Sequence, residues 1–300
     1  MNMNAELAWG RRYLMVRPDH FRVDYAINPF MDLDVQPDPG LAHAQWDAIV
    51  RAIEAAGGEV VVLDQRADSP DMVYAMNLGF PVVDRDGGQA VVLSHMRYPE
   101  RRNETGTAAE FFTGRGATLH VIGRDGVGAH FEAGDAFAWR GELVVGYGPR
   151  TEKLATKHLA LELGTTVRRF RITHPGMYHM DLSFCPLDET HAMVCPAAYD
   201  DASARDLLAL VPEPLVLTEE EAMTFCANSI VIGRTVIMPA CPQRVREQLE
   251  AWGFEVVLVE VSEFLKGGGA VRCLTNPLDV TLGRDLRSDA ARLGTGRGDS

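Results

Sequence analysis

Residues 227–240, ANSIVIGRTVIMPA, and residues 245–265, VREQLEAWGFEVVLVEVSEFL, contain the pattern that decides the fold. The first stretch predicts a β-hairpin, because two apolar runs flank the turn residues Gly233 and Arg234. The second stretch predicts an amphipathic helix that stops near Gly253 and is followed by a buried strand. Together they form one ββαβ unit, whose apolar face needs neighbouring units to bury it.

The same unit recurs along the chain. Helix–strand patterns also occupy residues 45–64, 109–122 and 159–172, and hairpins occupy residues 76–94, 133–148 and 180–198. Their turns are Asp86-Gly87-Gly88, Arg140-Gly141 and Asp188-Glu189. Each hairpin opens near an Asn or Asp, and we call these positions the marker residues: Asn77, Asp135, Asp181 and Asn228, with Asn276 in LTNPLDVTLG (274–283) as the marker of a fifth, truncated hairpin. Their spacing of roughly 45–60 positions predicts about five units in closed repetition.

We therefore expect an α/β fold of about five ββαβ units in a single domain over residues 1–287. The alternative is a doubly wound α/β sheet, but helices separate the strands of such sheets, and the recurring hairpins argue against it. Residues 288–300 are rich in Gly, Ser and charge and are expected to be a disordered tail. The RGDS string in that tail is expected to be a chance match.

Composition excludes several classes of protein. The formal net charge of −13 disfavours nucleic acid and anionic membranes as partners and favours cationic ligands. No apolar run approaches the ~20 residues of a membrane span. The five cysteines are scattered without a CxxC pair, which predicts reduced thiols in the cytoplasm. The oligomeric state is left open, with a homodimer as one option.

If the units surround one axis, the loops beside the marker residues converge at one end. These loops carry a thiol, imidazoles and carboxylates, namely Cys273 behind Gly267–Gly269, His179 with His174, Glu132, Asp71, Asp135, Asp181 and the amide of Asn77. Such a set suits nucleophilic catalysis with acid–base assistance.

Each candidate also has an ordinary structural interpretation. A lone cysteine after glycines is more often a small buried residue, and Cys185, Cys195 and Cys226 lie in apolar contexts typical of a core. Glu132 and Asp135 could cap a turn. His179 and Asp181 could form a simple hydrogen-bonding pair. A metal site is not expected, because no HExxH or comparable ligand spacing occurs. The shared position of the candidates in different units favours the catalytic interpretation.

The motifs FEAGD (131–135), YHMDLSFCPL (178–187) and GGGAVRCLTNPL (267–278), in this order, resemble those of the guanidino-group-modifying enzymes, the pentein superfamily. YLMVRPDHFRVDYAINPFM (13–31) and PDMVYAMNLGF (70–80) resemble the arginine dihydrolase and dimethylargininase branch. The resemblance covers about residues 12–285. It implies a five-bladed ββαβ propeller and a small cationic guanidino substrate, with no metal or organic cofactor.

In this resemblance Cys273 corresponds to the nucleophile, His179 to the general acid and base, and Glu132 to a carboxylate that engages the guanidinium. Asn77 and Asp181 would line the guanidinium site, and Asp71 and Asp135 are placed with the substrate-binding residues. Arg17, Arg97 and Arg150 are basic candidates for the remainder of the substrate.

Asn77 departs from the aspartate of many deiminases and dimethylargininases, and asparagine there resembles the arginine dihydrolases. The leading expectation is therefore an arginine dihydrolase that works through a covalent thiouronium intermediate on cysteine. A dimethylargininase follows, then an amidinotransferase or arginine deiminase. A non-catalytic relative that binds arginine-like ligands is the alternative from a different class.

Overall fold

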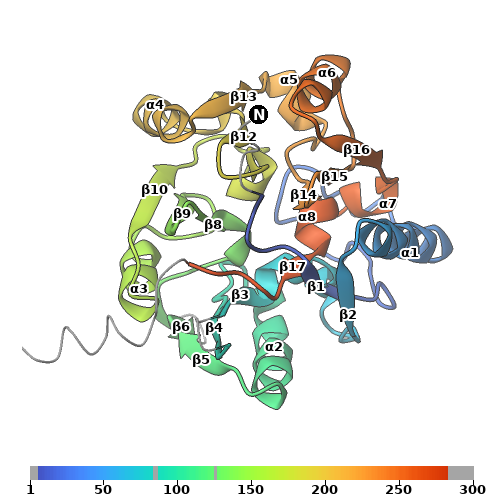
Figure 1. Ribbon diagram of the computed structural model, residues 1–300. Coiled ribbons are helices and arrows are strands. Elements are labelled where there is room, and N and C mark those ends of the chain that lie inside the picture. Colours follow the sequence, from blue (N-terminus) through green and yellow to red (C-terminus); the bar gives the residue numbers. More distant parts are fainter. Residues whose placement is uncertain (1–5, 84–86, 125–126, 283–300) are drawn as a thin grey trace, which may run out of the picture.

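The structure is a computed structural model that describes residues 6–83, 87–124 and 127–282. The described residues form five three-stranded sheets arranged around one axis, with the helices on the outside of the ring (Figure 1). The five-unit ββαβ architecture expected from the sequence is confirmed. The predicted tail at residues 288–300 and the turn residue Asp86 lie outside the described residues.

Each sheet has an inner strand antiparallel to its middle strand and an outer strand parallel to that middle strand. In the order inner, middle, outer, the strands are β17 (Asn276–Pro277), β1 (Arg12–Val16), β2 (Glu59–Leu63); β3 (Gly79–Val83), β4 (Gln89–Leu93), β5 (Thr118–Val121); β8 (Ala136–Trp139), β9 (Glu142–Tyr147), β10 (Val167–Arg171); β11 (Phe184–Pro186), β12 (His191–Val194), β13 (Glu213–Val216); and β14 (Ile230–Ile232), β15 (Thr235–Met238), β16 (Glu255–Leu258). A two-stranded ribbon, β6 (Gly123–Arg124) and β7 (Val127–Gly128), lies apart from them.

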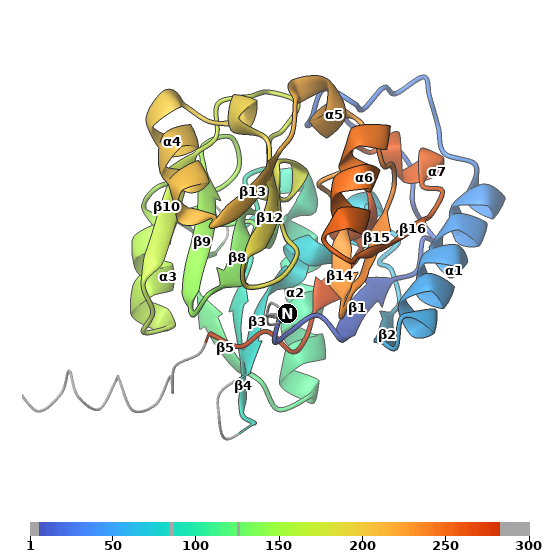
Figure 2. The same cartoon turned by 45° about the horizontal axis from the view of Figure 1, so that its top comes forward.

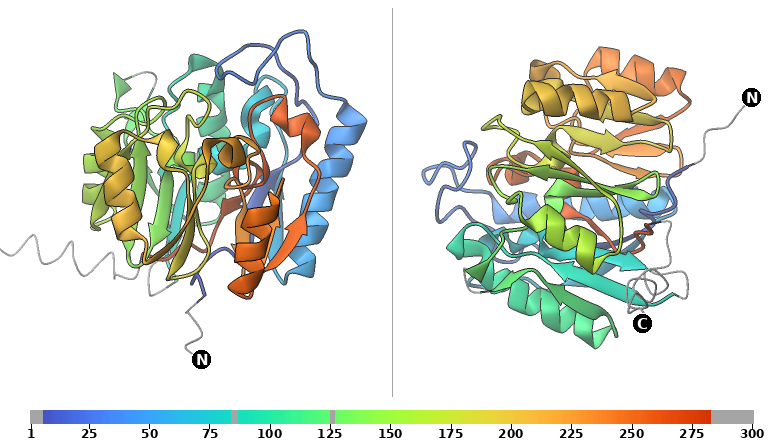
Figure 3. Two further views of the ribbon diagram at one scale, coloured as in Figure 1. Left: turned by 90° about the horizontal axis from the view of Figure 1, so that it is seen from above. Right: turned by 90° about the vertical axis from the view of Figure 1, so that its left-hand side faces the viewer.

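Each middle strand leads to its outer strand through one helix on the rim, as both views in Figure 3 show. These helices are α1 (Pro39–Ala55), α2 (Arg102–Gly114), α3 (Ala155–Glu162), α4 (Asp201–Leu210) and α6 (Gln243–Ala251). Three shorter helices belong to the loops, namely α5 (Glu219–Met223), α7 (Ser262–Leu265) and α8 (Val271–Leu274). The 3-10 turns are η1 (Pro70–Val73), η2 (Ala75–Leu78), η3 (Pro99–Arg101), η4 (Ala133–Asp135), η5 (Met180–Leu182) and η6 (Pro196–Ala198). No helix of the described residues is long and apolar enough to span a bilayer.

Two elements differ from the sequence expectation. Residues 274–282 do not form a hairpin of their own, because the short strand β17 pairs with β1 from the opposite end of the chain, with Leu14 opposite Asn276. Local patterns cannot reveal such a partner. The helix α4 and strand β13 were not anticipated either, since Pro212 and Pro214 interrupt the strand pattern. Proline is tolerated there because β13 is an outer strand with one open edge.

Local sequence explains the hairpin between β8 and β9. Arg140 and Gly141 form its two-residue turn with φ values of 53° and 75°. Positive φ at both positions gives the type I′ turn, whose twist matches that of the flanking strands.

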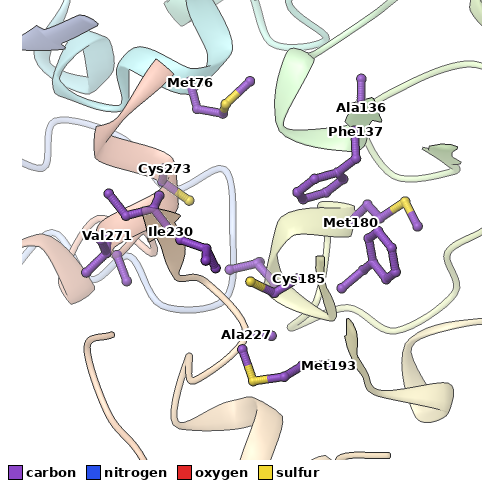
Figure 4. Close-up of a cluster of buried hydrophobic side chains, with 14 of the residues drawn as sticks. Met76, Ala136, Phe137, Met180, Cys185, Met193, Ala227, Ile230, Val271 and Cys273 are labelled. Carbon is purple, nitrogen blue, oxygen red and sulfur yellow. The ribbon is translucent and has the colours of Figure 1, made fainter. Parts of the chain in front are cut away.

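Apolar side chains of the inner strands and marker loops fill the centre of the ring (Figure 4). Phe137 of β8 and Phe184 of β11 meet edge to face, with ring centroids 5.2 Å apart. Each such buried side chain stabilises the fold by roughly 1.5–3 kcal/mol. The axis is therefore a packed core that holds the loops above it in place.

Four of the five marker residues join neighbouring units through hydrogen bonds to backbone groups. Asn77 Oδ1 accepts from Gly134 N, and Asp135 Oδ1 accepts from Met180 N. Asn228 Nδ2 donates to the carbonyl oxygen of Asp181, and Asn276 Nδ2 donates to that of Gly79. The side chain of Asp181 instead contacts the thiol of Cys273, which Asn228 also contacts. The marker residues thus join neighbouring units of the ring, and two of them also hold this thiol.

Candidate active site

A narrow cavity lies at the end of the ring where the marker loops meet. The segment between β1 and α1 passes over this end of the molecule (Figure 2). The lining side chains and backbone come from Ile27, Asn28, Asp71, Tyr74, Asn77, Arg101, Arg150, Tyr178, His179, Gly267, Gly269 and Cys273. A larger and more open hollow lies beside α2, but the described residues that line it include no cysteine and no carboxylate. The narrow cavity is therefore the candidate active site.

The glycine loop before Cys273 gives space to two neighbouring side chains. A Cβ at Gly267 would overlap the hydroxyl of Tyr74, which donates to the Phe264 carbonyl oxygen. Gly268 has φ +85°, and a Cβ there would lie 2.5 Å from Asn28 Oδ1. Glycine permits both the left-handed backbone and the close approach. The loop then enters the short helix α8, which presents Cys273 to the cavity.

The Cys273 thiol is held by two side chains. Asn228 Nδ2 donates to Sγ over 3.2 Å, and Sγ lies 3.6 Å from Asp181 Oδ2. Asn228 Oδ1 also accepts from the backbone N–H of Cys273 over 3.2 Å. Burial, assisted by the negative charge of Asp181, raises the pKa of Cys273. Cys273 is therefore a neutral thiol in this cavity.

His179 lies against a buried ion pair. Its Nε2 is 2.8 Å from Glu132 Oε2, and the same oxygen accepts from Arg150 over 2.9 Å. Glu132 Oε1 accepts from the backbone N–H of Arg97. Although burial alone would raise it, the pKa of Glu132 is lowered, because Arg150 and His179 stabilise the carboxylate. Glu132 itself does not line the cavity and lies one layer behind His179.

Burial lowers the pKa of His179 despite the opposing effect of Glu132. With an ionised Glu132 and a neutral imidazole, the proton is on Nε2 and is donated to the carboxylate. Nδ1 then carries the lone pair. A Cβ at Gly134 would lie 3.4 Å from this Nδ1, so glycine leaves the space beside it open. The lone pair of Nδ1 therefore lies on the side of Gly134, away from Glu132.

Asn77 has a fixed amide orientation. Its Oδ1 accepts from Gly134 N over 2.9 Å, so the amide nitrogen faces the cavity that Asn77 lines. The wall near Cys273 therefore offers a hydrogen-bond donor where an aspartate would offer a second acceptor.

The three predicted aspartates lie at different depths from the cavity wall. Asp71 lines the cavity, and its Oδ1 has no hydrogen-bond partner among the described residues. Asp181 lies behind Cys273, and Asp135 is held behind it by Met180 N. Burial raises the pKa of Asp71 to about 6 and that of Asp181 to about 7. An entering cation would favour the ionised forms of both.

Of the three arginines predicted as basic candidates, one lines the cavity and two do not. Arg150 lines the cavity, whereas Arg17 and Arg97 are half-exposed and pair with Asp19 and Glu152 at 3.8 and 3.4 Å. Arg101 was not anticipated. It lines the cavity, forms a bidentate pair with Glu104 and donates to the carbonyl oxygen of Asp71. In the sequence, Arg101 and Glu104 look like an exposed ion pair between residues i and i+3. Only their burial in the structure distinguishes them from such a surface pair.

The remaining imidazole and thiols lie elsewhere. His174 pairs with Glu219 at 3.2 Å and does not line the cavity. Cys185, Cys195 and Cys226 are buried without disulfides, as their apolar contexts predicted. Within the described ranges, no cluster of three or more His, Cys, Asp or Glu side chains is arranged to hold a metal ion.

Comparisons with known proteins show what this chain is similar to. Residues 17–280 match the model of the family described as "N,N dimethylarginine dimethylhydrolase, eukaryotic". A dimethylarginine dimethylaminohydrolase of Mycobacterium tuberculosis is 34% identical over 88% of this chain and 85% of that protein. The bifunctional arginine dihydrolase/ornithine cyclodeaminase ArgZ of Synechocystis is also 34% identical over 88% of this chain, which spans 37% of ArgZ.

Solved structures show the same relationship. The N-terminal domain of ArgZ, an arginine dihydrolase, in a cysteine-to-serine variant bound to substrate, superposes with a TM-score of 0.84 at 32% identity. The match covers 90% of this chain and 99% of that one. A dimethylarginine hydrolase of Pseudomonas aeruginosa with citrulline has a TM-score of 0.70 at 19% identity, which supports the fold alone.

Proposed function

Because the chain belongs to the dimethylargininase and arginine dihydrolase branch of the guanidino-group-modifying enzymes, we propose that it hydrolyses L-arginine to ornithine, two ammonia molecules and carbon dioxide. Its pentein fold and its family make it a hydrolase of the C–N bonds of guanidino groups. The choice of arginine, of two successive hydrolyses and of Cys273 as nucleophile is our proposal.

One observation supports the dihydrolase most directly, namely the amide nitrogen of Asn77 that faces the cavity. A guanidinium has only N–H donors, so a donor in the wall does not help to bind it. The first hydrolysis turns the group into a ureido group with a carbonyl oxygen. The Asn77 amide can donate to that oxygen, hold the citrulline-like species and polarise it for a second attack.

The charges of the cavity suit arginine as the substrate. The carboxylates Asp181 and Asp71 lie at Cys273 and at the cavity wall, and both gain from a cation nearby. We place the guanidinium near Asp181 and the α-ammonium near Asp71. Arg101 and Arg150 line the same cavity and would engage the α-carboxylate.

The first chemical step needs a thiolate. With the guanidinium bound, its positive charge lowers the pKa of the adjacent Cys273 thiol, and the proton moves from Sγ to His179 Nδ1. The thiolate attacks the central guanidino carbon, forming the C–S bond and a tetrahedral adduct. His179, held by Glu132, returns the proton to a departing nitrogen, and ammonia leaves.

Water completes the cycle. His179 takes a proton from a water molecule, whose oxygen attacks the thiouronium carbon, and cleavage of the C–S bond restores Cys273. If the ureido product stays on the Asn77 amide, a second cycle consumes another water and releases the second ammonia. The carbamate left on the δ-nitrogen then breaks down to carbon dioxide and ornithine. Over both cycles one arginine and two waters are consumed.

The test is a product assay on arginine with the unmodified protein and with Asn77→Asp. We expect ornithine from the unmodified protein and a shift toward citrulline in the variant, with arginine still consumed. Asn103→Asp adds the same charge at an exposed position and should leave the ornithine-to-citrulline ratio unchanged. Release of citrulline alone by the unmodified protein would exclude the dihydrolase and indicate a deiminase.

A second candidate is a dimethylargininase, which is favoured by the description of the matching family model and by the mycobacterial relative. It would convert dimethylarginine to citrulline and dimethylamine. Consumption of dimethylarginine but not arginine would select it. Transfer of the amidino group to an added amine would indicate an amidinotransferase, and binding without turnover a ligand-binding relative. The cytoplasmic location stays a prediction.

A further inference from the structure

Tyr178 immediately precedes His179 in the chain and lines the same cavity. Its hydroxyl donates to the carbonyl oxygen of Gly268 over 2.6 Å in a buried contact. Burial raises the pKa of Tyr178, so the phenol keeps the proton that it donates. The hydrogen bond therefore joins the segment that carries His179 to the glycine loop, Gly267–Gly269, that precedes Cys273.

The ring of Tyr178 lies against the groups that hold His179. The Arg150 guanidinium lies over this ring, 4.5 Å from its centre, and the imidazole of His179 is 5.0 Å from it between ring centres. Arg150 and His179 both contact Glu132 Oε2. Tyr178 is thus fixed at its ring by the neighbours of the imidazole and at its hydroxyl by the glycine loop.

Two further side chains, Tyr74 and Asn28, donate to carbonyl oxygens of the glycine loop and of the short helix before it. Both belong to segments other than that of His179. Within the described part of the chain, no other hydrogen bond joins Tyr178 or His179 to residues 267–273. Tyr178 therefore links the imidazole's segment to the loop in a way that the other two donors do not.

We propose that Tyr178 is a positioning residue that sets the distance between the Cys273 thiol and the imidazole of His179. This inference rests on the proposed function, in which the Sγ proton passes to His179 and then to the departing nitrogen. Proton transfer needs the two groups within about 2.6–3.2 Å of each other or joined by one water. A shift of about 1 Å can lower a rate about 100-fold. The hydroxyl of Tyr178 resists such a shift, because it ties the two segments together.

The test compares Tyr178→Phe with the unmodified protein. The substitution removes the hydroxyl and keeps the ring under Arg150. We expect kcat to fall roughly tenfold or more. Labelled arginine should add to Cys273 more slowly by the same factor in an acid-quench time course. In a Cys273→Ser background, the affinity for arginine measured by calorimetry should change by less than about twofold, because the hydroxyl acts on the reaction and not on binding.

Tyr199→Phe is the matched control. Tyr199 is also a buried tyrosine, and its hydroxyl is 2.8 Å from Ser183 Oγ, at the far end of the turn η5, without lining the cavity. Both variants should lose similar stability in a denaturant titration, and only Tyr178→Phe should lose kcat.

An unchanged kcat in Tyr178→Phe, an equal fall in both variants, or a loss confined to arginine affinity would overturn the proposal. Failure of Tyr178→Phe to fold would assign the hydroxyl to stability and overturn it as well. Absence of both turnover and adduct in the unmodified protein would instead contradict the proposed function.

Discussion

At the scale of single residues, one buried chain of contacts, Arg150–Glu132–His179, sets the protonation state of the site. Because both oxygens of Glu132 are occupied, its carboxylate is fixed and ionised. The imidazole of His179 therefore holds its proton on the Glu132 side and keeps its lone pair on Nδ1, the opposite ring nitrogen. The motif FEAGD made Glu132 a candidate, but its sequence gives no sign that Glu132 contacts His179 and does not line the cavity.

Glu132→Gln tests this arrangement. The amide removes the negative charge, so His179 loses its orientation and Arg150 is left buried without a counter-charge. We expect kcat to fall about 100-fold or more and the free energy of unfolding to fall by about 3–5 kcal/mol. Both are measured on one preparation, by arginine consumption and by denaturant titration.

Glu104→Gln is the control, since it breaks the neighbouring buried pair with Arg101 without touching His179. It should cost similar stability and raise KM, with kcat largely retained. If both variants lowered kcat equally, the special role of Glu132 would be refuted.

At the scale of elements, the loop Gly267–Gly269 and helix α8 decide where the Cys273 thiol lies. The sequence indicated a loop that approaches the substrate closely. The structure adds that the glycines accommodate Tyr74 and Asn28, both of which line the cavity. The loop is therefore shaped by its protein neighbours as well as by the space left for a ligand.

Gly268→Ala and Gly57→Ala separate the effect of backbone strain from the effect of the close contact between Gly268 and Asn28. Both glycines have φ +85°, but a Cβ at Gly57 would meet nothing within 4 Å. We expect each alanine to cost about 1–2 kcal/mol of folding stability through the left-handed backbone. Only Gly268→Ala should also collide with Asn28, displace Cys273 and lower kcat/KM, by roughly tenfold or more. Equal activity of the two variants in an arginine-consumption assay would show that the glycine loop does not position the thiol.

At the scale of the whole molecule, the repeated unit was visible in the sequence because hairpin turns and helix stops are local signals. The marker residues Asn77, Asp135, Asp181 and Asn228 gave the register of the ring, and with it the convergence of Cys273 and His179 on one cavity. Ring closure by β1 and β17 was not predictable, since it joins opposite ends of the chain. Arg101 was missed for a related reason. Its sequence neighbours, Glu100 and Arg102, are those of a surface arginine, and burial depends on contacts from other parts of the chain.

The central claim is that Cys273 forms a covalent bond to the guanidino carbon, and an acid quench during turnover tests it most directly. Arginine labelled at the guanidino carbon is supplied in excess, and the digested protein is analysed by mass spectrometry. We predict that the peptide containing Cys273 gains the mass of labelled arginine less one ammonia, and that Cys273→Ser, which is nearly isosteric, folds normally but shows neither adduct nor turnover. Full turnover in the serine variant, or an adduct confined to Cys185, Cys195, Cys226 or Cys241, would contradict the account.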